Sequence, residues 1–290
     1  MGSQPAEGAP LRAAIDVAPL GEFADPRAIV ALAQAAESAG WDGLSTWDTL
    51  GATMGGAAAD PFVTLAAVAA TTRRLTLITS VIVLPRRRPQ LVVQAIGSLD
   101  RLSGGRCVLG VGAGADGGDF EPFADDFARP GRIGRMDESL GLVDALLRGE
   151  TVDHAGPAYR LLGAAVGPSP VQAPRPPIWL GGMRPGALRR AARWDGWIAI
   201  ATGDDGDSMA LSVGSFGTLV RRVQAERESS GRAAETFDIA VFGRSDNGGS
   251  ALVEEYAGGG ATWWLESLSP MRGSLDELLA VVRDGPPTVR

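Results

Sequence analysis

Glycines that close two predicted strands are the residues whose spacing first suggests chemistry. Gly110, Gly112 and Gly114 form a GxGxG pattern in RCVLGVGAGAD, and Gly181 and Gly182 follow the run PPIWL. A residue without a Cβ lets a flat ring or a phosphate approach the backbone. A glycine pair leading into a helix N-terminus also favours anions. These glycines are candidates for holding a ring and a phosphate, the alternatives being close packing at a barrel corner and an ordinary strand–helix turn.

Polar and aromatic side chains at other predicted strand ends could face the same site. Trp47, Asp48 and Thr49 follow the second strand, while Asp16 and Asp116 lie near the ends of the first and fourth. A carboxylate can act as an acid or base, although helix capping and turn chemistry also explain aspartates here. We predict Trp47 and Thr49 as ring or substrate contacts, Asp48 as the residue that positions them, and Asp116 as an acid/base candidate.

Three cationic side chains, Arg86, Arg87 and Arg88, follow the third predicted strand. Such a run is usually a solvated loop, but at this end of a barrel it could also attract the anionic tail of a cofactor.

The residues that are missing exclude several kinds of enzyme. The chain has no lysine, which removes Schiff-base chemistry and the P-loop lysine. Its one histidine, His154, rules out a three-histidine zinc site, and we expect it on the surface of an insertion. The one cysteine, Cys107, rules out a disulfide framework and favours a cytoplasmic location.

Charge and hydropathy narrow the choice of partners. The net charge of −7 argues against nucleic acid or an anionic membrane as the main partner. No apolar run approaches the roughly 20 residues that span a bilayer. Residues 1–11 lack the pattern of a signal peptide and are expected to be a disordered lead-in. A small-molecule substrate is the expected partner.

Short apolar runs alternate with helix-length amphipathic segments along the chain. Strands are expected at residues 13–17, 43–47, 75–84, 106–111, 177–180, 197–201, 237–242 and 261–266. Helices are expected to begin near residues 26, 61, 89, 130, 185, 208, 250 and 274. Eight strand–helix units predict an α/β fold with a parallel sheet closed as a (β/α)8 TIM barrel. We expect one domain over residues 12–287, with a hairpin insertion at about 150–176.

The alternative architecture is an open doubly wound sheet. Its fingerprint is a GxGxxG turn after the first strand, and residues 16–24 contain no such pattern.

Several motifs in a fixed order carry a family resemblance. They are WDGLSTWD, RLTLITSVIVLPRRRP and LDRLSGGRCVLGVGAGA, to which PPIWLGG, AARWDGW, GATWWLE and a terminal GPP add. With them the chain resembles the bacterial luciferase-like superfamily of flavin- and deazaflavin-dependent oxidoreductases, over about residues 12–287. The resemblance implies a luciferase-like barrel that binds FMN or the deazaflavin coenzyme F-420.

The same resemblance implies where a cofactor would lie. In the deazaflavin branch a non-proline cis peptide on the third strand often supports the ring, and the matching bond is Ser80–Val81. The cofactor-binding positions that it implies are Thr79, Ser80 and Val81 under the ring, Gly112, Ala113 and Gly114 in the pocket wall, and Gly181, Gly182 and Met183 in the phosphate loop.

Two positions depart from the family pattern. Asp48 is followed by Thr49 where many relatives have histidine, and Ala115 stands where the sugar-phosphate dehydrogenase branch has glutamate. That branch also binds its substrate phosphate with lysines, which argues against glucose 6-phosphate as the substrate.

We therefore predict an oxidoreductase that uses coenzyme F-420 for hydride transfer to or from a small organic substrate. Alternatives are an FMN-dependent monooxygenase served by a flavin reductase, a cofactor-independent barrel enzyme, and a degenerate non-catalytic barrel. The resemblance also implies a homodimer, formed through helices near strands two and three.

Overall fold

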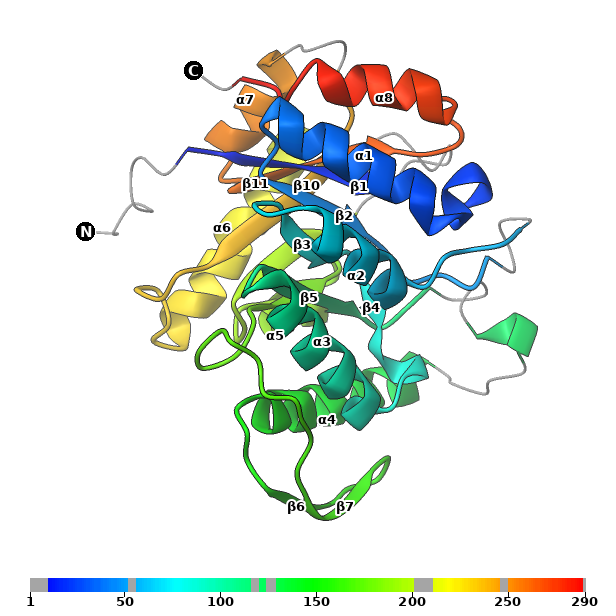
Figure 1. Cartoon of the computed structure of the whole chain (residues 1–290). Helices are drawn as coiled ribbons and strands as arrows, with labels where there is room; N and C mark the ends of the chain where they lie inside the picture. The colour runs from blue at the N-terminus through cyan, green and yellow to red at the C-terminus, as the bar shows by residue number, and fades with distance from the viewer. Residues whose placement is uncertain are drawn as a thin grey trace.

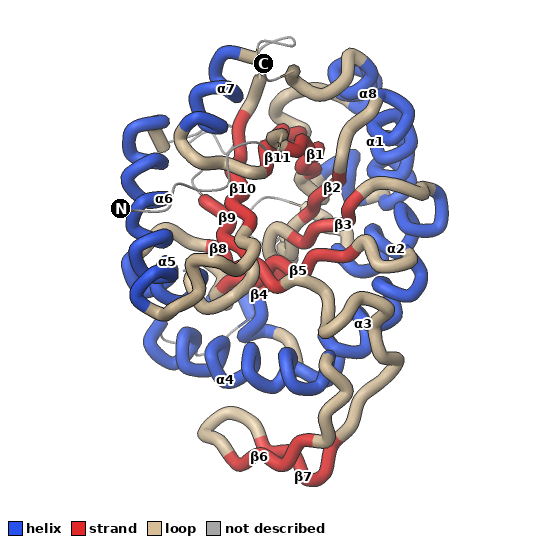
Figure 2. Tube along the Cα trace, turned by 90° about the vertical axis from the view of Figure 1, so that its left-hand side faces the viewer, coloured by secondary structure: helices blue, strands red, loops and turns tan. Residues whose placement is uncertain are grey.

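Eight parallel strands close into a barrel in this computed structural model, which describes residues 10–51, 56–115, 120–123, 129–200, 211–245 and 250–288. In order around the barrel they are β1 (Arg12–Val17), β2 (Gly43–Thr46), β3 (Thr76–Thr79), β5 (Cys107–Gly112), β8 (Ile178–Gly181), β9 (Gly196–Ala199), β10 (Asp238–Gly243) and β11 (Trp263–Leu268). Pairing of β1 with both β2 and β11 closes the sheet. Figure 2 shows the ring of strands enclosed by helices. The predicted TIM barrel is confirmed.

Eight α-helices surround the strands. They are α1 (Pro26–Ala39), α2 (Pro61–Thr71), α3 (Pro89–Ser103), α4 (Arg129–Leu147), α5 (Pro185–Ala191), α6 (Val213–Ser229), α7 (Ala251–Gly258) and α8 (Leu275–Arg283). The described residues also include three 3-10 turns, η1 (Gly21–Ala24), η2 (Leu84–Arg86) and η3 (Glu121–Phe123).

Capping residues fix where the helices begin. Asp25 and Asp60 accept hydrogen bonds from first-turn N–H groups of α1 and α2, and a proline follows each of them. These caps satisfy donors that the helix itself leaves free. Helix α1 ends at Ala39, and Gly40 caps its C-terminus with a φ of +89°, a value that favours glycine. None of the helices in the described ranges is long and apolar enough to cross a bilayer.

The third predicted strand is interrupted, so the expectation of one continuous strand over 75–84 is wrong. β3 ends at Thr79, and a two-residue strand, β4 (Ile82–Val83), pairs again with β5. The peptide bond between them, Ser80–Val81, is cis, at the position that the family resemblance implies. Every residue here is compatible with a buried strand, so hydrophobic patterning alone could not show the break.

Large side chains fill the barrel interior. Trp179 and Trp263 meet edge to face there, with ring centroids 5.8 Å apart, among small and branched residues from other strands. Trp264 points the other way and packs on Tyr256 of α7. The two adjacent tryptophans of β11 thus divide between the inside and the helices, as strand alternation predicts.

A hairpin of β6 (Val152–Ala155) and β7 (Arg160–Ala164) lies between α4 and β8. It projects outside the ring at the lower end of the molecule in Figure 1. This is the predicted insertion. His154 lies on it and contacts Glu138 of α4, with Nε2 and Oε1 2.8 Å apart.

Candidate active site at the barrel mouth

Val81 is the centre of the surface at the C-terminal ends of the strands. A Cβ on Gly112 would lie 2.7 Å from Val81 Cγ2, and a Cβ on Gly181 would lie 3.0 Å from Val81 Cγ1. A Cβ on Gly181 would also meet Ile200 Cδ1 at 2.5 Å. Gly112 and Gly181 therefore both lie beside Val81, a third predicted site residue. Val81 and Ile200 are half-buried and cover the barrel core, so they form an apolar platform at the mouth.

Asp16 lies beside the cis peptide, at the end of β1. Its Oδ1 accepts hydrogen bonds from Ser45 Oγ at 2.5 Å and Ser80 Oγ at 2.7 Å. The side chain is buried, with 6 % of the residue exposed. Burial raises the pKa of Asp16 to about 6, although both serine hydroxyls act to lower it. The carboxyl therefore exchanges its proton near neutral pH, which suits acid/base chemistry.

Asp16, Ser45 and Ser80 form a cluster that sequence patterning does not reveal. Asp16 has an equal explanation as a turn residue, and Ser45 carries no signal in the sequence. The usable signal is alternation, because Ala14 faces the barrel interior and Asp16, two residues on, faces the same way.

Asp48 is an ion-paired carboxylate. Arg87 donates to both of its oxygens at 2.9 Å, Arg86 lies 2.9 Å from Oδ1, and the Val83 N–H donates at 3.1 Å. Burial acts to raise its pKa, but these arginines and the N–H hold the pKa below the ordinary value. Asp48 is thus fixed in the ionised state, which fits positioning better than proton transfer. Arg86 and Arg87 are engaged with it rather than forming a solvated loop.

Trp47 and Thr49 flank Asp48 and are both half-buried. The Thr49 hydroxyl accepts a hydrogen bond from the Gly51 N–H at 3.1 Å. Their contacts with a ring or a substrate stay predictions. Asp116, the acid/base candidate, lies outside the described residues.

Thr79 and Gly110 join β3 to β5. The Thr79 hydroxyl donates to the Gly110 carbonyl and accepts from the Gly110 N–H, both at 2.8 Å. A Cβ on Gly110 would lie 1.9 Å from the Thr79 carbonyl oxygen, so close packing accounts for this glycine. The Thr79 side chain is buried in this contact and braces the barrel wall.

The predicted phosphate loop follows β8. Gly182 has a φ of +121°, a region that favours glycine. Its N–H donates to the Ile198 carbonyl at 3.3 Å, and its carbonyl accepts from Trp197 Nε1 at 2.7 Å. Gly181, Gly182 and Met183 are half-buried, and α5 begins next with no side-chain cap on its first turn. Pro185 carries no N–H, and the Ala187 and Leu188 N–H groups donate to the Arg184 carbonyl. The Gly186 N–H is thus the first-turn donor that remains for an anion.

On the other wall of the mouth, the described residues that follow β5 are small. Ala113 and Gly114 continue from β5 and are half-buried, and Gly114 has a φ of +77°. Among the described residues, no group of three His, Cys, Asp or Glu side chains could hold a metal ion.

A flat, largely apolar ring fits this arrangement. The platform of Val81 and Ile200 offers partly exposed apolar surface, and Gly112 and Gly181 let these two side chains lie close against the strand ends. The start of α5 follows β8, and its Gly186 N–H is a donor available to a phosphate.

Comparisons with known proteins agree with this geometry. The chain is 37 % identical over 183 residues to an uncharacterized protein of Mycobacterium tuberculosis, which is 63 % of this chain and 59 % of the relative. The match thus spans less than two thirds of that relative's length.

Two solved structures share the fold. One is a coenzyme F-420 dependent tetrahydromethanopterin reductase from Methanopyrus kandleri, with a TM-score of 0.77, 16 % identity, and coverage of 95 % of this chain and 98 % of that one. The other is the oxygenating constituent of 3,6-diketocamphane monooxygenase from Pseudomonas putida, in complex with FMN, with a TM-score of 0.62, 18 % identity, and coverage of 81 % and 67 %.

A family model described as luciferase-like monooxygenase matches residues 6–245, which is most of the chain. Together with the closed barrel and its cis peptide on the third strand, this match shows that the chain belongs to the luciferase-like monooxygenase family.

Proposed function

We propose that this protein is an oxidoreductase that uses coenzyme F-420 for hydride transfer to or from a small organic substrate. The observation that carries the proposal is the platform of Val81, which the Ser80–Val81 peptide presents between Gly112 and Gly181. The platform supports binding of a flat ring, and the choice of F-420 over FMN is supported by the F-420 dependence of the Methanopyrus kandleri reductase, which shares the fold.

Different residues around the mouth would bind the ring and the phosphate of the cofactor. Val81 and Ile200 would lie under the ring, with Gly112, Ala113 and Gly114 beside it. Gly181, Gly182, Met183 and the first turn of α5 would hold the phosphate. When bound, the deazaflavin supplies or accepts the hydride, while the protein provides orientation and exclusion of water.

Asp16 is the group of this chain that can hold a proton close to the platform. Both serine hydroxyls donate to its Oδ1, which leaves Oδ2 to carry the proton below a pKa of about 6. Reduction of a carbonyl or imine needs a proton as well as a hydride, so this carboxyl suits either direction of the reaction.

The second candidate is an FMN-dependent monooxygenase with a flavin reductase as partner. The FMN complex of the Pseudomonas putida relative and the name of the family model favour it. The platform accepts either ring, because isoalloxazine and deazaflavin have the same shape.

Binding titrations with F-420 and with FMN, followed by fluorescence quenching, test the proposal. We expect binding of F-420 at micromolar concentration or tighter, and weaker binding of FMN. A preference for FMN would favour the monooxygenase, and binding of neither would leave the non-catalytic barrel.

A matched pair of variants tests whether the cofactor binds on the platform. Gly112→Ala places a methyl group 2.7 Å from Val81 Cγ2 and should weaken cofactor binding about tenfold or more, because Val81 must move. Gly141→Ala on α4 meets nothing within 4 Å and should leave the affinity unchanged. Equal affinities in the two variants would exclude the platform as the ring site.

A further inference from the structure

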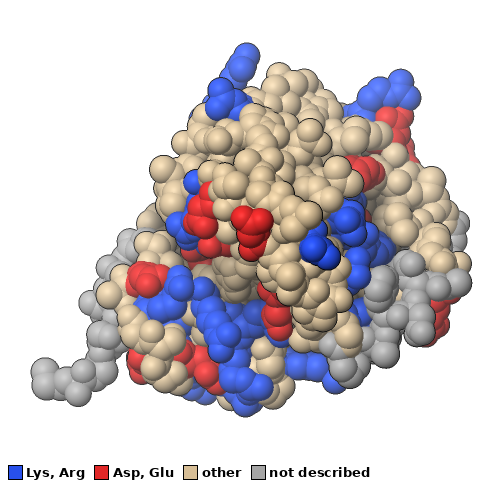
Figure 3. All heavy atoms as spheres, turned by 90° about the horizontal axis from the view of Figure 1, so that it is seen from below, with Lys and Arg blue, Asp and Glu red and all other residues tan. Residues whose placement is uncertain are grey.

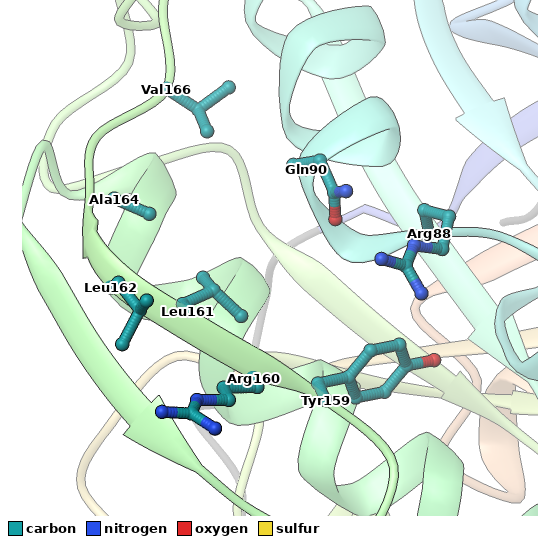
Figure 4. A pocket seen from close by; sticks show the side chains of 8 residues that line it. All are labelled: Arg88, Gln90, Tyr159, Arg160, Leu161, Leu162, Ala164 and Val166. Atoms are coloured by element: carbon teal, nitrogen blue, oxygen red, sulfur yellow. The ribbon is translucent and has the colours of Figure 1, made fainter.

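A cavity lies outside the barrel, between the start of α3 and the β6–β7 hairpin. Its volume is about 320 Å³, near the lower end of the range for ligand pockets. Arg88 and Gln90 line it from α3, and Tyr159, Arg160 and apolar side chains between positions 161 and 166 line it from β7 (Figure 4). Neither the cofactor site nor the proposed reaction uses these residues.

Two anchors hold the walls of this cavity. Glu138 of α4 accepts hydrogen bonds from the Ala158 and Tyr159 N–H groups at 3.0 and 2.9 Å. Asp100 of α3, which is fully buried, accepts from the Val171 and Gln172 N–H groups at 2.7 and 3.0 Å. The chain between these anchors includes β7. Hydrogen bonds therefore fix the backbone at both ends of the segment that forms this wall of the cavity.

Tyr159 is the observation that points to a ligand. The residue is 4 % exposed, and its hydroxyl is buried without a hydrogen-bond partner. Buried polar atoms in native proteins nearly always have a partner, so an unsatisfied hydroxyl requires an explanation. Tyr159 lines the cavity, and in Figure 4 its hydroxyl extends toward the side on which Arg88 lies. A ligand oxygen at this position would complete the hydrogen bond.

The charge of the cavity defines that ligand further. Arg88 and Arg160 are exposed, and within the described part of the chain neither forms an ion pair. The Arg88 guanidinium lies 6.0 Å from the centroid of the Tyr159 ring. Figure 3, which views the end that carries the hairpin, shows arginines gathered around a hollow in this face. In a chain with a net charge of −7, this is a local site for an anion.

The opposite wall is apolar. Leu161, Leu162 and Val166 contribute aliphatic surface, and Leu162 is 75 % exposed. Exposed aliphatic groups beside unpaired arginines suit a molecule that is charged at one end and apolar at the other.

We propose that this cavity is a second ligand site, which binds a small organic anion with an apolar body, such as a medium-chain carboxylate. The carboxylate would lie between Arg88 and the Tyr159 hydroxyl, and the chain would lie along Leu161 and Val166. Arg160, which extends away from Arg88 in Figure 4, would add positive charge at the rim. The site is independent of the proposed cofactor.

Calorimetric titration of the whole protein with octanoate tests this site, with octan-1-ol and inorganic phosphate as comparison probes. We expect octanoate to bind at least about tenfold more tightly than either probe, because only octanoate offers both a charge and an apolar chain. Equal binding of octan-1-ol would contradict recognition of the anion, and equal binding of phosphate would contradict the apolar wall. No binding of octanoate would overturn the proposal.

Variants decide whether octanoate binds here or at the barrel mouth. Arg88→Gln and Tyr159→Phe should each weaken binding about tenfold, from loss of a hydrogen bond to a charged group. Arg160→Gln should weaken it less, because that guanidinium lies at the rim. Arg222→Gln on α6, an exposed arginine, is the matched control and should change nothing. Octanoate binding that both Arg88→Gln and Arg160→Gln leave intact would place it elsewhere and overturn the proposal. Unchanged melting temperatures would show that the variants fold.

Discussion

At the scale of single residues, Asp16 has the most perturbed chemistry at the mouth. Its carboxyl is buried on the face of β1 that points toward the barrel axis. Its two hydrogen-bond donors, Ser45 and Ser80, are also buried. Neutral hydroxyls compensate a carboxylate only in part, so burial dominates and its pKa rises to about 6. The protein thus holds one carboxyl in a state that changes charge within the physiological range.

This raised pKa predicts how stability depends on pH. The folded protein keeps the Asp16 proton up to about pH 6, whereas the unfolded chain releases it near 3.8. The stabilisation is complete below the lower value and is lost as the pH rises through the upper one. Between about pH 4.5 and pH 7.5, the wild-type free energy of unfolding should fall by about 2 kcal/mol relative to that of Asp16→Asn.

Urea unfolding of both proteins at the two pH values measures this difference. Asn cannot ionise, so other titrating groups contribute equally to both proteins and cancel. A wild-type-to-variant difference that stays constant across the range would mean that the Asp16 carboxyl has an ordinary pKa in the folded protein.

Some of the site residues were accessible from sequence and others were not. Gly112 and Gly181 stand out because they end strands, and strand ends meet at the mouth of a barrel. The contact of both glycines with Val81 could not be predicted, because it depends on a break in the third strand within an unbroken apolar run. Ser45 was missed because a serine in a short strand carries no signal until its neighbours are known.

At the scale of elements, Arg87 joins three of them. Its guanidinium donates to Asp48 after β2 and to Asp60 at the start of α2, each at 2.9 Å, while Arg87 itself follows η2. The planar fork of arginine matches a carboxylate with two parallel hydrogen bonds. The loops after β2 and β4 are therefore held together beside Val81.

Asp48→Asn should destabilise the fold by about 3 kcal/mol at neutral pH, because it leaves Arg86 and Arg87 without their buried counter-charge. Because the pKa of Asp48 is lowered, its contribution to stability changes with pH in the opposite direction to that of Asp16. Its stabilisation is present above the ordinary value of 3.8 and is lost as the pH falls through the lower folded value.

Thermal or urea unfolding of the Asp48→Asn variant between about pH 3 and pH 7 checks both statements. The difference from wild type should shrink on acidification. Asp276→Asn, at an exposed position in the first turn of α8, is the control and should change stability much less. A destabilisation by Asp48→Asn that is the same at every pH would mean that the ion pair is not its cause.

The order of elements was predictable because each helix start has a local cause. Asp25 and Asp60 with their following prolines mark α1 and α2, and these positions are correct to the residue. The prediction of one continuous third strand was wrong because its geometry comes from contacts with Asp16 of β1, Thr46 of β2 and Asp48 just after β2. Local signals fix where elements lie, whereas tertiary contacts fix how they bend.

At the scale of the whole molecule, α2 and α3 present the surface that a second copy would cover. These helices are neighbours on the outside of the barrel (Figure 1), and they expose Val63, Leu91 and Leu102 at 62 %, 59 % and 53 %. Val63 and Leu91 are each the third residue of their helix. Single exposed aliphatic residues are ordinary, but a group on adjacent helices is typical of an interaction site.

The small residues between them strengthen this expectation. Ala66, Ala67 and Ala70 of α2 are exposed or half-buried, and they would let a second helix pair approach closely. We therefore expect a homodimer of about 60 kDa, twice the chain mass of 30.0 kDa, by light scattering after gel filtration.

Val63→Asp should shift this dimer to the monomer at micromolar concentration, because a charge at the centre of an apolar interface loses its hydration without gaining a partner. Leu252→Asp, on α7 with 40 % exposure, introduces the same charge away from this surface and should leave the mass unchanged. A dimer that survives Val63→Asp would place the interface elsewhere, and a monomeric wild type would leave these aliphatic residues to a different partner.

Arg87 and the barrel mouth lie directly beside the start of α2. A dimer formed here would therefore hold the loops that carry Asp48 and Val81, and its dissociation should weaken cofactor binding as well.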